Sequence, residues 1–278
     1  MRSLEEVKRS FQSIEPLGRG GQKVVYLAEH AQWGNVVFKL YFAPDDPRAE
    51  REISIGRDLD LANVPPIHEV GHLLHEGQRT LYLVEEFIDG DLMSDRIAEG
   101  RRFSLLEAVD FLEQGLGFIC QLEDAHIVHR DIKPANIILG TDGRVIFLDF
   151  GIARVLNDIS ITGTEALQGP HSPGYSAPEQ FNNLKDKIDS RADLFSLGVV
   201  TYEALTGENP FLVGARTQLE VLRNTETVTP VSRQIDGDSS QQFMALLGSL
   251  MGRYPSRRPR NAQEALRWLN AAKDTLDM

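Results

Sequence analysis

The hydrophobic pattern of the chain changes near Gly90, and this change limits the folds that it can adopt. Before Gly90, short runs rich in β-branched and aromatic residues follow one another, at residues 24–28, 36–42 and 80–84. Runs of this kind between turn-forming residues predict β-strands. After Gly90 apolar residues recur at helical spacing, so the second part is predicted to be mainly helical.

Two helices can be placed by their ends. Residues 47–61 are predicted as a helix, because Pro47 suits a first helical position and the prolines at 65 and 66 prevent continuation. A second, longer helix is predicted after Ser104, which can cap its first turn. The chain is therefore predicted to be of the α+β class, with a small sheet and one main helix in residues 1–88 and a larger helical part in residues 89–278.

Composition excludes several classes of protein. The chain has 278 residues, a net charge of −12 and 41% hydrophobic residues, which is typical of a globular protein but unsuited to a nucleic-acid partner. Its single cysteine, Cys120, excludes an intramolecular disulfide framework and a multi-cysteine zinc site. No apolar run is long enough to span a membrane and the first residues do not resemble a signal peptide, so we expect a cytoplasmic location.

The segment His-Arg-Asp-Ile-Lys-Pro-Ala-Asn at residues 129–136 carries the most specific chemistry. It places Asp131, Lys133 and Asn136 on one turn. The carboxylate can accept a hydroxyl proton, the lysine can neutralise a transferring phosphoryl group, and the amide oxygen can bind magnesium. This combination points to phosphoryl transfer.

Three other motifs suit a nucleotide and its metal. Residues 17–25 follow a Gly-x-Gly-x-x-Gly-x-Val pattern except at Lys23, and such loops bring backbone N–H groups against phosphates. Lys39 ends the run Val-Val-Phe-Lys and needs a carboxylate partner, for which Glu52 is the natural candidate and Glu50 the alternative. Asp149, in Asp-Phe-Gly, would add a second metal ligand.

In this order the motifs resemble those of the eukaryotic-type protein kinase family, most closely its bacterial serine/threonine kinases. The resemblance extends over residues 11–276 and includes Ala-Pro-Glu at residues 177–179. It implies a bilobal protein-kinase-like fold and one kinase domain over residues 1–278, with a catalytic loop at 129–136 and an activation segment at 149–179.

The resemblance also implies the role of each residue. Asp131 and Lys133 would act on the acceptor hydroxyl and the γ-phosphate, Lys39 would hold the α/β-phosphates and pair with Glu52, and Asn136 and Asp149 would bind Mg²⁺, with Mn²⁺ as an alternative. Asp193 would brace the catalytic loop, and Arg258 would pair with Glu179. The remaining ATP-binding positions would be Gly18, Gly20, Val25, Glu86, Ile88 and Ile138.

Substrate choice and regulation have their own residues in the family. Lys133 is typical of serine/threonine kinases, and Ser172 stands where the family has a threonine that lines the acceptor site. Arg130 and Arg154 resemble a pocket for an activation-loop phosphate, for which Thr162 and Thr164 are the expected acceptors. We therefore expect protein substrates, autophosphorylation and self-association for phosphorylation in trans.

Three residues depart from the family pattern. Lys23 replaces the third glycine of the phosphate loop, and Glu85 stands where an apolar residue is usual, so that it could pair with Lys39 or face away. Gly56 replaces a larger apolar residue one turn after Glu52, which predicts a mobile helix and a resting state with Lys39 apart from Glu52.

The combined prediction is an ATP- and magnesium-dependent serine/threonine protein kinase. Two alternatives remain open at this stage: a pseudokinase that binds without catalysing, and a small-molecule phosphotransferase of the same broad fold. The presence of Lys39, Asp131, Asn136 and Asp149 weighs against the first, and the combination of Glu179, Asp193 and Arg258 weighs against the second.

Overall fold

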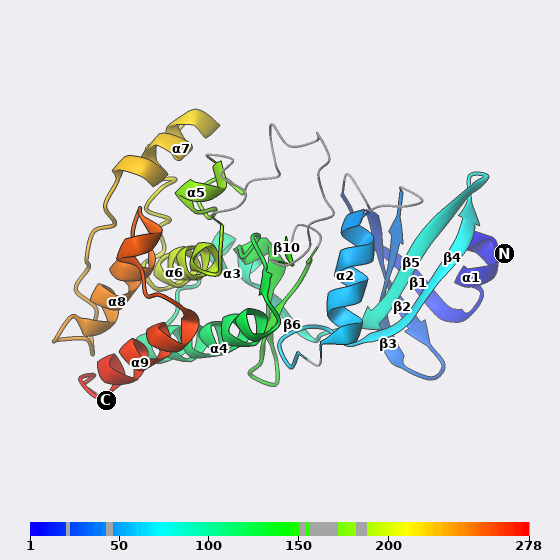
Figure 1. Cartoon of the computed structure of the whole chain (residues 1–278). Helices are drawn as coiled ribbons and strands as arrows, with labels where there is room; N and C mark the ends of the chain where they lie inside the picture. The colour runs from blue at the N-terminus through cyan, green and yellow to red at the C-terminus, as the bar shows by residue number, and fades with distance from the viewer. Residues whose placement is uncertain are drawn as a thin grey trace. The chain divides into compact units, whose positions relative to one another are not determined.

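A computed structural model of the chain describes residues 1–20, 23–42, 47–59, 61–150, 154–155, 172–181 and 188–277. It divides into two compact units. The first, here called unit 1, comprises Met1–Gly90 and Leu148–Gly151, and the second, unit 2, comprises Asp91–Phe147 and Ile152–Met278. The α+β class predicted from the sequence is confirmed, because unit 1 is built on an antiparallel sheet and unit 2 is mainly helical (Figure 1).

The sheet of unit 1 has five antiparallel strands in the order β1-β2-β3-β5-β4. Side chains alternate between its faces, so that Lys39 and Tyr41 lie on the same side of β3. The strands predicted at residues 24–28, 36–42 and 80–84 correspond to β2, β3 and β5. The bounds are β1 Phe11–Arg19, β2 Lys23–His30, β3 Gly34–Tyr41, β4 Ile67–His75 and β5 Gln78–Glu86.

A two-residue turn joins β4 to β5 and sets their register. Glu76 and Gly77 both have positive φ, 50° and 78°, as a type I′ hairpin turn requires. His75 therefore lies opposite Gln78, and the pairing continues to Glu85 at the far end of the strand. On its other side β5 pairs with β3, where Glu85 lies opposite Val37, two residues from Lys39.

The helix α2, Pro47–Asp58, packs against β4 (Figure 1). It begins at Pro47 as predicted and ends three residues before the predicted end. A Cβ atom at Gly56 would lie 2.5 Å from the Cδ1 atom of Ile67 on β4. The glycine is thus explained by a close approach between helix and sheet, and the mobility of the helix stays a prediction.

One helix of unit 1 is not predicted by the sequence pattern. The helix α1, Leu4–Lys8, is only five residues long, which is too short to show a helical period. Ser3 and Glu6 form a reciprocal capping box at its start, and Val7 is buried in the same apolar cluster as Phe11 and Tyr82. The first residues are therefore part of the core of unit 1.

Unit 2 is organised around α6, Arg191–Thr206, in which every residue from Ala192 onward is buried. The helix α4, Leu105–Asp124, packs on α6 and on α9, Ala262–Lys273 (Figure 1). Ser104 caps α4 through a capping box with Glu107, which confirms the predicted start of this helix. The other helices are α3 Met93–Ala98, α5 Pro178–Phe181, α7 Gln218–Thr227 and α8 Gln242–Leu250.

Short strands in unit 2 carry the segments that hold the predicted site. A three-stranded sheet has the order β6-β8-β9, and β10 pairs with β7 in a separate ribbon. The bounds are β6 Gly90–Leu92, β7 Ile127–Val128, β8 Ile137–Gly140, β9 Val145–Phe147 and β10 Arg154–Val155. Among the helices that the structure describes, none has both the length and the apolar composition needed to cross a membrane.

Candidate active site

In unit 2, three side chains converge on the carboxylate of Asp131. The Lys133 ammonium lies 2.7 Å from Oδ2, and the Asn136 amide donates to the same oxygen at 2.9 Å. The hydroxyl of Ser172 donates to Oδ1 at 2.7 Å and lies 3.0 Å from Lys133. The structure thus brings four predicted residues together, with the Asp131 carboxylate as the hydrogen-bond acceptor at the centre. One of its hydrogen bonds comes from a serine hydroxyl.

Asp193 holds the backbone that leads into this site. Its side chain is fully buried and accepts hydrogen bonds from the backbone N–H groups of His129 and Arg130, both at 2.8 Å. Arg130 has a φ of 71°, a left-handed conformation that a non-glycine residue adopts only when its surroundings enforce it. Burial raises the pKa of Asp193 to about 7, while the two backbone hydrogen bonds act in the opposite direction.

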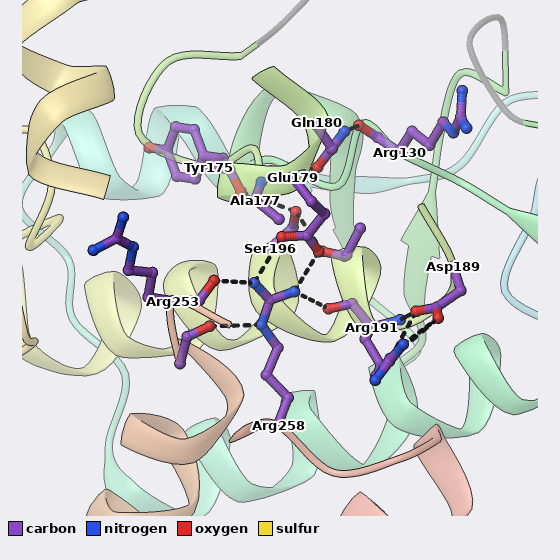
Figure 2. A network of polar contacts seen from close by, with 12 residues as sticks. Arg130, Tyr175, Ala177, Glu179, Gln180, Asp189, Arg191, Ser196, Arg253 and Arg258 are labelled. Atoms are coloured by element: carbon purple, nitrogen blue, oxygen red, sulfur yellow. Dashed lines mark hydrogen bonds and ion pairs between the residues drawn. The ribbon is translucent and has the colours of Figure 1, made fainter. Parts of the chain in front are cut away.

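Gln180 also holds the loop, and sequence reasoning did not identify it. Its amide nitrogen donates to the carbonyl of Arg130 at 2.9 Å, and its amide oxygen accepts from the backbone N–H of Ala177 (Figure 2). It thereby links α5 to the loop at residues 129–136. Its position directly after Glu179 in the Ala-Pro-Glu segment was the feature of the sequence that could have identified it.

The predicted pair of Arg258 and Glu179 forms the centre of a larger network. The two guanidinium NH groups of Arg258 lie 2.6 and 2.9 Å from the two carboxylate oxygens of Glu179 (Figure 2). The same guanidinium donates to the backbone carbonyls of Arg191, Gly252 and Arg253 and lies over the ring of Phe195. This network ties α5, α6 and the segment before α9 together beneath the site.

Only part of the predicted phosphate-acceptor region can be located. Thr162 and Thr164 lie outside the described residues, and Arg154 is described only in its backbone. Arg154 pairs with Val128 between β10 and β7, which places its backbone beside the strand that leads directly to Arg130. The grouping of the two arginine side chains remains a prediction.

In unit 1, Lys39 is buried between two carboxylates. Its ammonium lies 2.8 Å from Glu52 Oε1 on α2 and 2.8 Å from Glu85 Oε1 on β5. The predicted partner Glu52 is therefore confirmed, and Lys39 is not held apart from it as the resting state was expected to require. Glu85 faces Lys39, which decides between the two orientations left open for it.

The charges of this cluster shift one another's pKa values. Burial alone would lower the pKa of Lys39, but the carboxylates of Glu52 and Glu85 raise it above its usual value. Burial likewise acts to raise the pKa of Glu52, yet Lys39 and Lys23 lower it to about 2. For Glu85, burial outweighs the attraction of Lys39, so its pKa is raised.

Two further residues of unit 1 bind Glu52, and neither was predicted to do so. The hydroxyl of Tyr41 donates to Oε2 at 2.9 Å, and the ammonium of Lys23 lies 3.0 Å from the same oxygen. Lys23 also lies 3.4 Å from Asp149 Oδ2. The alternation of β3, which puts Tyr41 on the side of Lys39, was the signal that could have identified the tyrosine.

The predicted nucleotide positions lie on strands or directly beside them. Gly18 pairs with Val25 between β1 and β2, and the N–H of Gly20 donates to the carbonyl of Lys23 at 2.9 Å, which closes the loop between these strands. Glu86 ends β5 and Ile88 is buried two residues later. Ile138 lies on β8 in unit 2, where it pairs with Ile146.

The predicted metal ligands suit a hard cation. Asn136 turns its amide nitrogen toward the backbone carbonyl and carboxylate of Asp131, so its oxygen is the atom left for a metal. Asp149 belongs to unit 1, and its role as a second metal ligand stays a prediction. The described residues contain no cluster of three or more His, Cys, Asp and Glu side chains that could hold a metal.

Comparison with known proteins identifies the family. A family model described as protein kinase domain matches residues 11–268. A probable serine/threonine-protein kinase of Streptomyces coelicolor is 34% identical over 206 residues, covering 70% of this chain and 30% of that protein. Probable serine/threonine-protein kinase PknB of Bifidobacterium longum is 31% identical over 242 residues, covering 82% and 34%.

Serine/threonine-protein kinase PrkC of Bacillus subtilis is 28% identical over 267 residues, covering 94% of this chain and 40% of the relative. The chain thus spans between 30% and 40% of the length of these three relatives. The family model covers most of the chain, and the motifs occur in the family's order. The chain therefore belongs to the protein kinase family.

Proposed function

We propose that the chain is a serine/threonine protein kinase, which transfers the γ-phosphoryl group of ATP to the hydroxyl of a serine or threonine in a protein. The observation that carries this proposal is the Ser172 hydroxyl, which donates to Asp131 at 2.7 Å while Lys133 lies 3.0 Å away. A substrate hydroxyl in a similar position would meet a proton acceptor and a cation together. The names of the bacterial relatives support serine and threonine as acceptors.

The proposed reaction needs little covalent chemistry from the protein. The substrate oxygen forms a bond to the γ-phosphorus, the bond to the ADP oxygen breaks, and the hydroxyl proton passes to Asp131. Lys133 neutralises charge that develops on the phosphoryl oxygens, and Lys39 binds the remaining phosphates. Asn136 and Asp149 would hold Mg²⁺, or Mn²⁺ as an alternative, which would neutralise phosphate charge.

Transfer of label from γ-labelled ATP to a generic protein acceptor tests the function. The variant Asp131→Asn keeps the size of the side chain but removes the proton acceptor, so we expect its rate to fall at least about 100-fold. ATP binding, measured separately, should persist. Asp142→Asn is the matched control, because Asp142 lies in the exposed turn between β8 and β9, where its carboxylate binds the side chain of Arg144 at 2.6 Å.

Each outcome of this test distinguishes one function from another. Label on serine or threonine that is lost in Asp131→Asn supports the proposal. ATP binding without transfer would instead identify a pseudokinase, and transfer to small molecules but not to proteins would identify a small-molecule phosphotransferase. Phosphoamino-acid analysis separates serine and threonine from tyrosine.

We also propose that the chain phosphorylates its own activation segment at Thr162 or Thr164, in trans between two copies. The pairing of β10 with β7, which brings the backbone of Arg154 near Arg130, supports a basic receptor for such a phosphate. Mass spectrometry of active protein should find phosphate at one of these threonines. Unchanged activity in a variant with alanine at both positions would contradict the proposal.

A further inference from the structure

Two residues that depart from the family pattern meet at the same ion pair. Lys23, from β2, and Glu85, from β5, both lie against the pair formed by Lys39 and Glu52. All four side chains are largely buried, with exposed side-chain fractions of 16% for Lys23 and 8% or less for the others. The order of contacts is Glu85, Lys39, Glu52, Lys23, so that acid and base alternate.

Glu52 does not depend on Lys39 alone. Its Oε1 atom lies 2.8 Å from the Lys39 ammonium and 3.3 Å from that of Lys23. Its Oε2 atom lies 3.0 Å from Lys23 and accepts the Tyr41 hydroxyl at 2.9 Å. Among the residues that the structure describes, Lys23 is thus the one whose ammonium reaches both oxygens of Glu52.

Lys39, in turn, is shared. Its ammonium is 2.8 Å from Glu52 and equally 2.8 Å from Glu85, so Glu85 competes for a cation that would otherwise belong to Glu52. A buried carboxylate that loses its partner is strongly destabilised. Lys23 therefore supplies Glu52 with a second cation, which compensates for the sharing of Lys39 with Glu85. The cluster thus contains two lysines and two buried glutamates.

We propose that Lys23 is a positioning residue that holds Glu52, and with it α2, in place while Glu85 holds Lys39. This proposal rests on the proposed function, in which Lys39 also contacts the phosphates of ATP. When the Lys39 ammonium turns toward a phosphate, Glu52 keeps Lys23 and Tyr41 as partners and does not move. Lys23 also reaches Asp149 at 3.4 Å, so one side chain joins β2, α2 and the Asp149 segment.

A double-mutant cycle tests the matched roles of Lys23 and Glu85. The variants are Lys23→Met, Glu85→Leu and the two combined. We expect Lys23→Met to lower kcat on the order of tenfold and to speed amide hydrogen exchange in α2 by a similar factor. In the Glu85→Leu background the same change should speed exchange in α2, measured without nucleotide, by no more than about twofold, because Lys39 is then available entirely to Glu52.

Two further variants separate positioning from general structural damage. Lys23→Arg should restore most of the kcat and the slow exchange of α2, because a guanidinium can still bind both oxygens of Glu52. Lys8→Met is the matched control, since Lys8 also pairs with a glutamate and lies over a tyrosine ring, but outside the cluster. Exchange in α4 of unit 2 should be equal in all variants, which shows that they fold.

The proposal is overturned if the effects of Lys23→Met and Glu85→Leu simply multiply, or if exchange in α2 does not respond to Lys23→Met. The exchange measurement is made without nucleotide, so it remains informative if no phosphoryl transfer is detected. In that case the proposed function fails, and the role of Lys23 is decided by whether Glu85→Leu suppresses its effect on α2.

Discussion

Buried charges hold the site together at the scale of single residues, and each has its partners in the structure. Asp193 is fully buried and accepts hydrogen bonds from two backbone N–H groups. The side chain of Arg258 has no exposed surface, and its guanidinium binds the carboxylate of Glu179 and three backbone carbonyls. Removing one partner of a buried charge is strongly destabilising, because it leaves the other charge buried and uncompensated. These residues are therefore sensitive points for stability.

Replacing Arg258 with leucine should lower the free energy of unfolding by about 3–5 kcal/mol, because it leaves the carboxylate of Glu179 buried and unpaired. Urea denaturation followed by circular dichroism measures this loss. Arg260→Leu is the control, because Arg260 has an exposed side-chain fraction of 83% and an exposed ion pair contributes little to stability. Equal losses in the two variants would contradict the importance assigned to the buried network.

The sequence predicted which residues carry the motifs but not where every side chain points. Lys39 with Glu52 and Arg258 with Glu179 were predicted as pairs and are found as pairs. Lys23 and Glu85 were noticed only as departures, because either side chain could face the cluster or face away from it. Their direction depends on strand register and on the position of α2, which the pattern of a single strand does not contain.

At the scale of elements, α4 contains two glycines with different surroundings. A Cβ atom at Gly115 would lie 2.6 and 2.8 Å from the two methyl carbons of Leu197 on α6, and Leu197 is fully buried. A Cβ atom at Gly117 would meet nothing within 4 Å. Gly115 thus lets α4 approach α6 closely, whereas Gly117 only weakens the helix.

Opposite effects are expected when each glycine is replaced by alanine. Gly117→Ala should stabilise the protein by about 0.5–1 kcal/mol through helix propensity alone. Gly115→Ala gains the same propensity but overpacks the contact with Leu197, which costs about 1–3 kcal/mol, so we expect a net loss of stability. Thermal or urea unfolding of the two variants measures the difference. If both variants are more stable than the original protein, Leu197 on α6 can shift to accommodate the added methyl group at little cost.

Elements were predicted well where their own residues carry a strong signal. The start of α4 follows from Ser104, and the central strands β3 and β5 follow from continuous apolar runs. The edge strand β1 has a mostly exposed pattern interrupted by Pro16 and Gly18, so only its pairing with β2 defines it. Edge strands have one partner and fewer buried positions, which weakens their signal in the sequence.

At the scale of the whole chain, acidic residues outnumber basic ones, and this excess bears on the protein substrates that the chain is proposed to phosphorylate. The chain has 29 Lys and Arg against 41 Asp and Glu, which gives the net charge of −12. A field of this sign attracts positively charged segments and speeds their encounter with the protein, and dissolved salt screens it. The effect acts on association and does not depend on a specific contact.

A serine peptide flanked by arginines should therefore lose kcat/KM as ionic strength rises, by about three- to tenfold between roughly 20 and 200 mM salt. A peptide with the same acceptor and uncharged flanks should change less than about twofold, which controls for effects of salt on the enzyme and on ATP. Initial rates with both peptides at fixed ATP and magnesium provide the measurement. If both peptides respond equally, the net charge does not guide substrates, and specificity has to come from direct contacts with the acceptor segment.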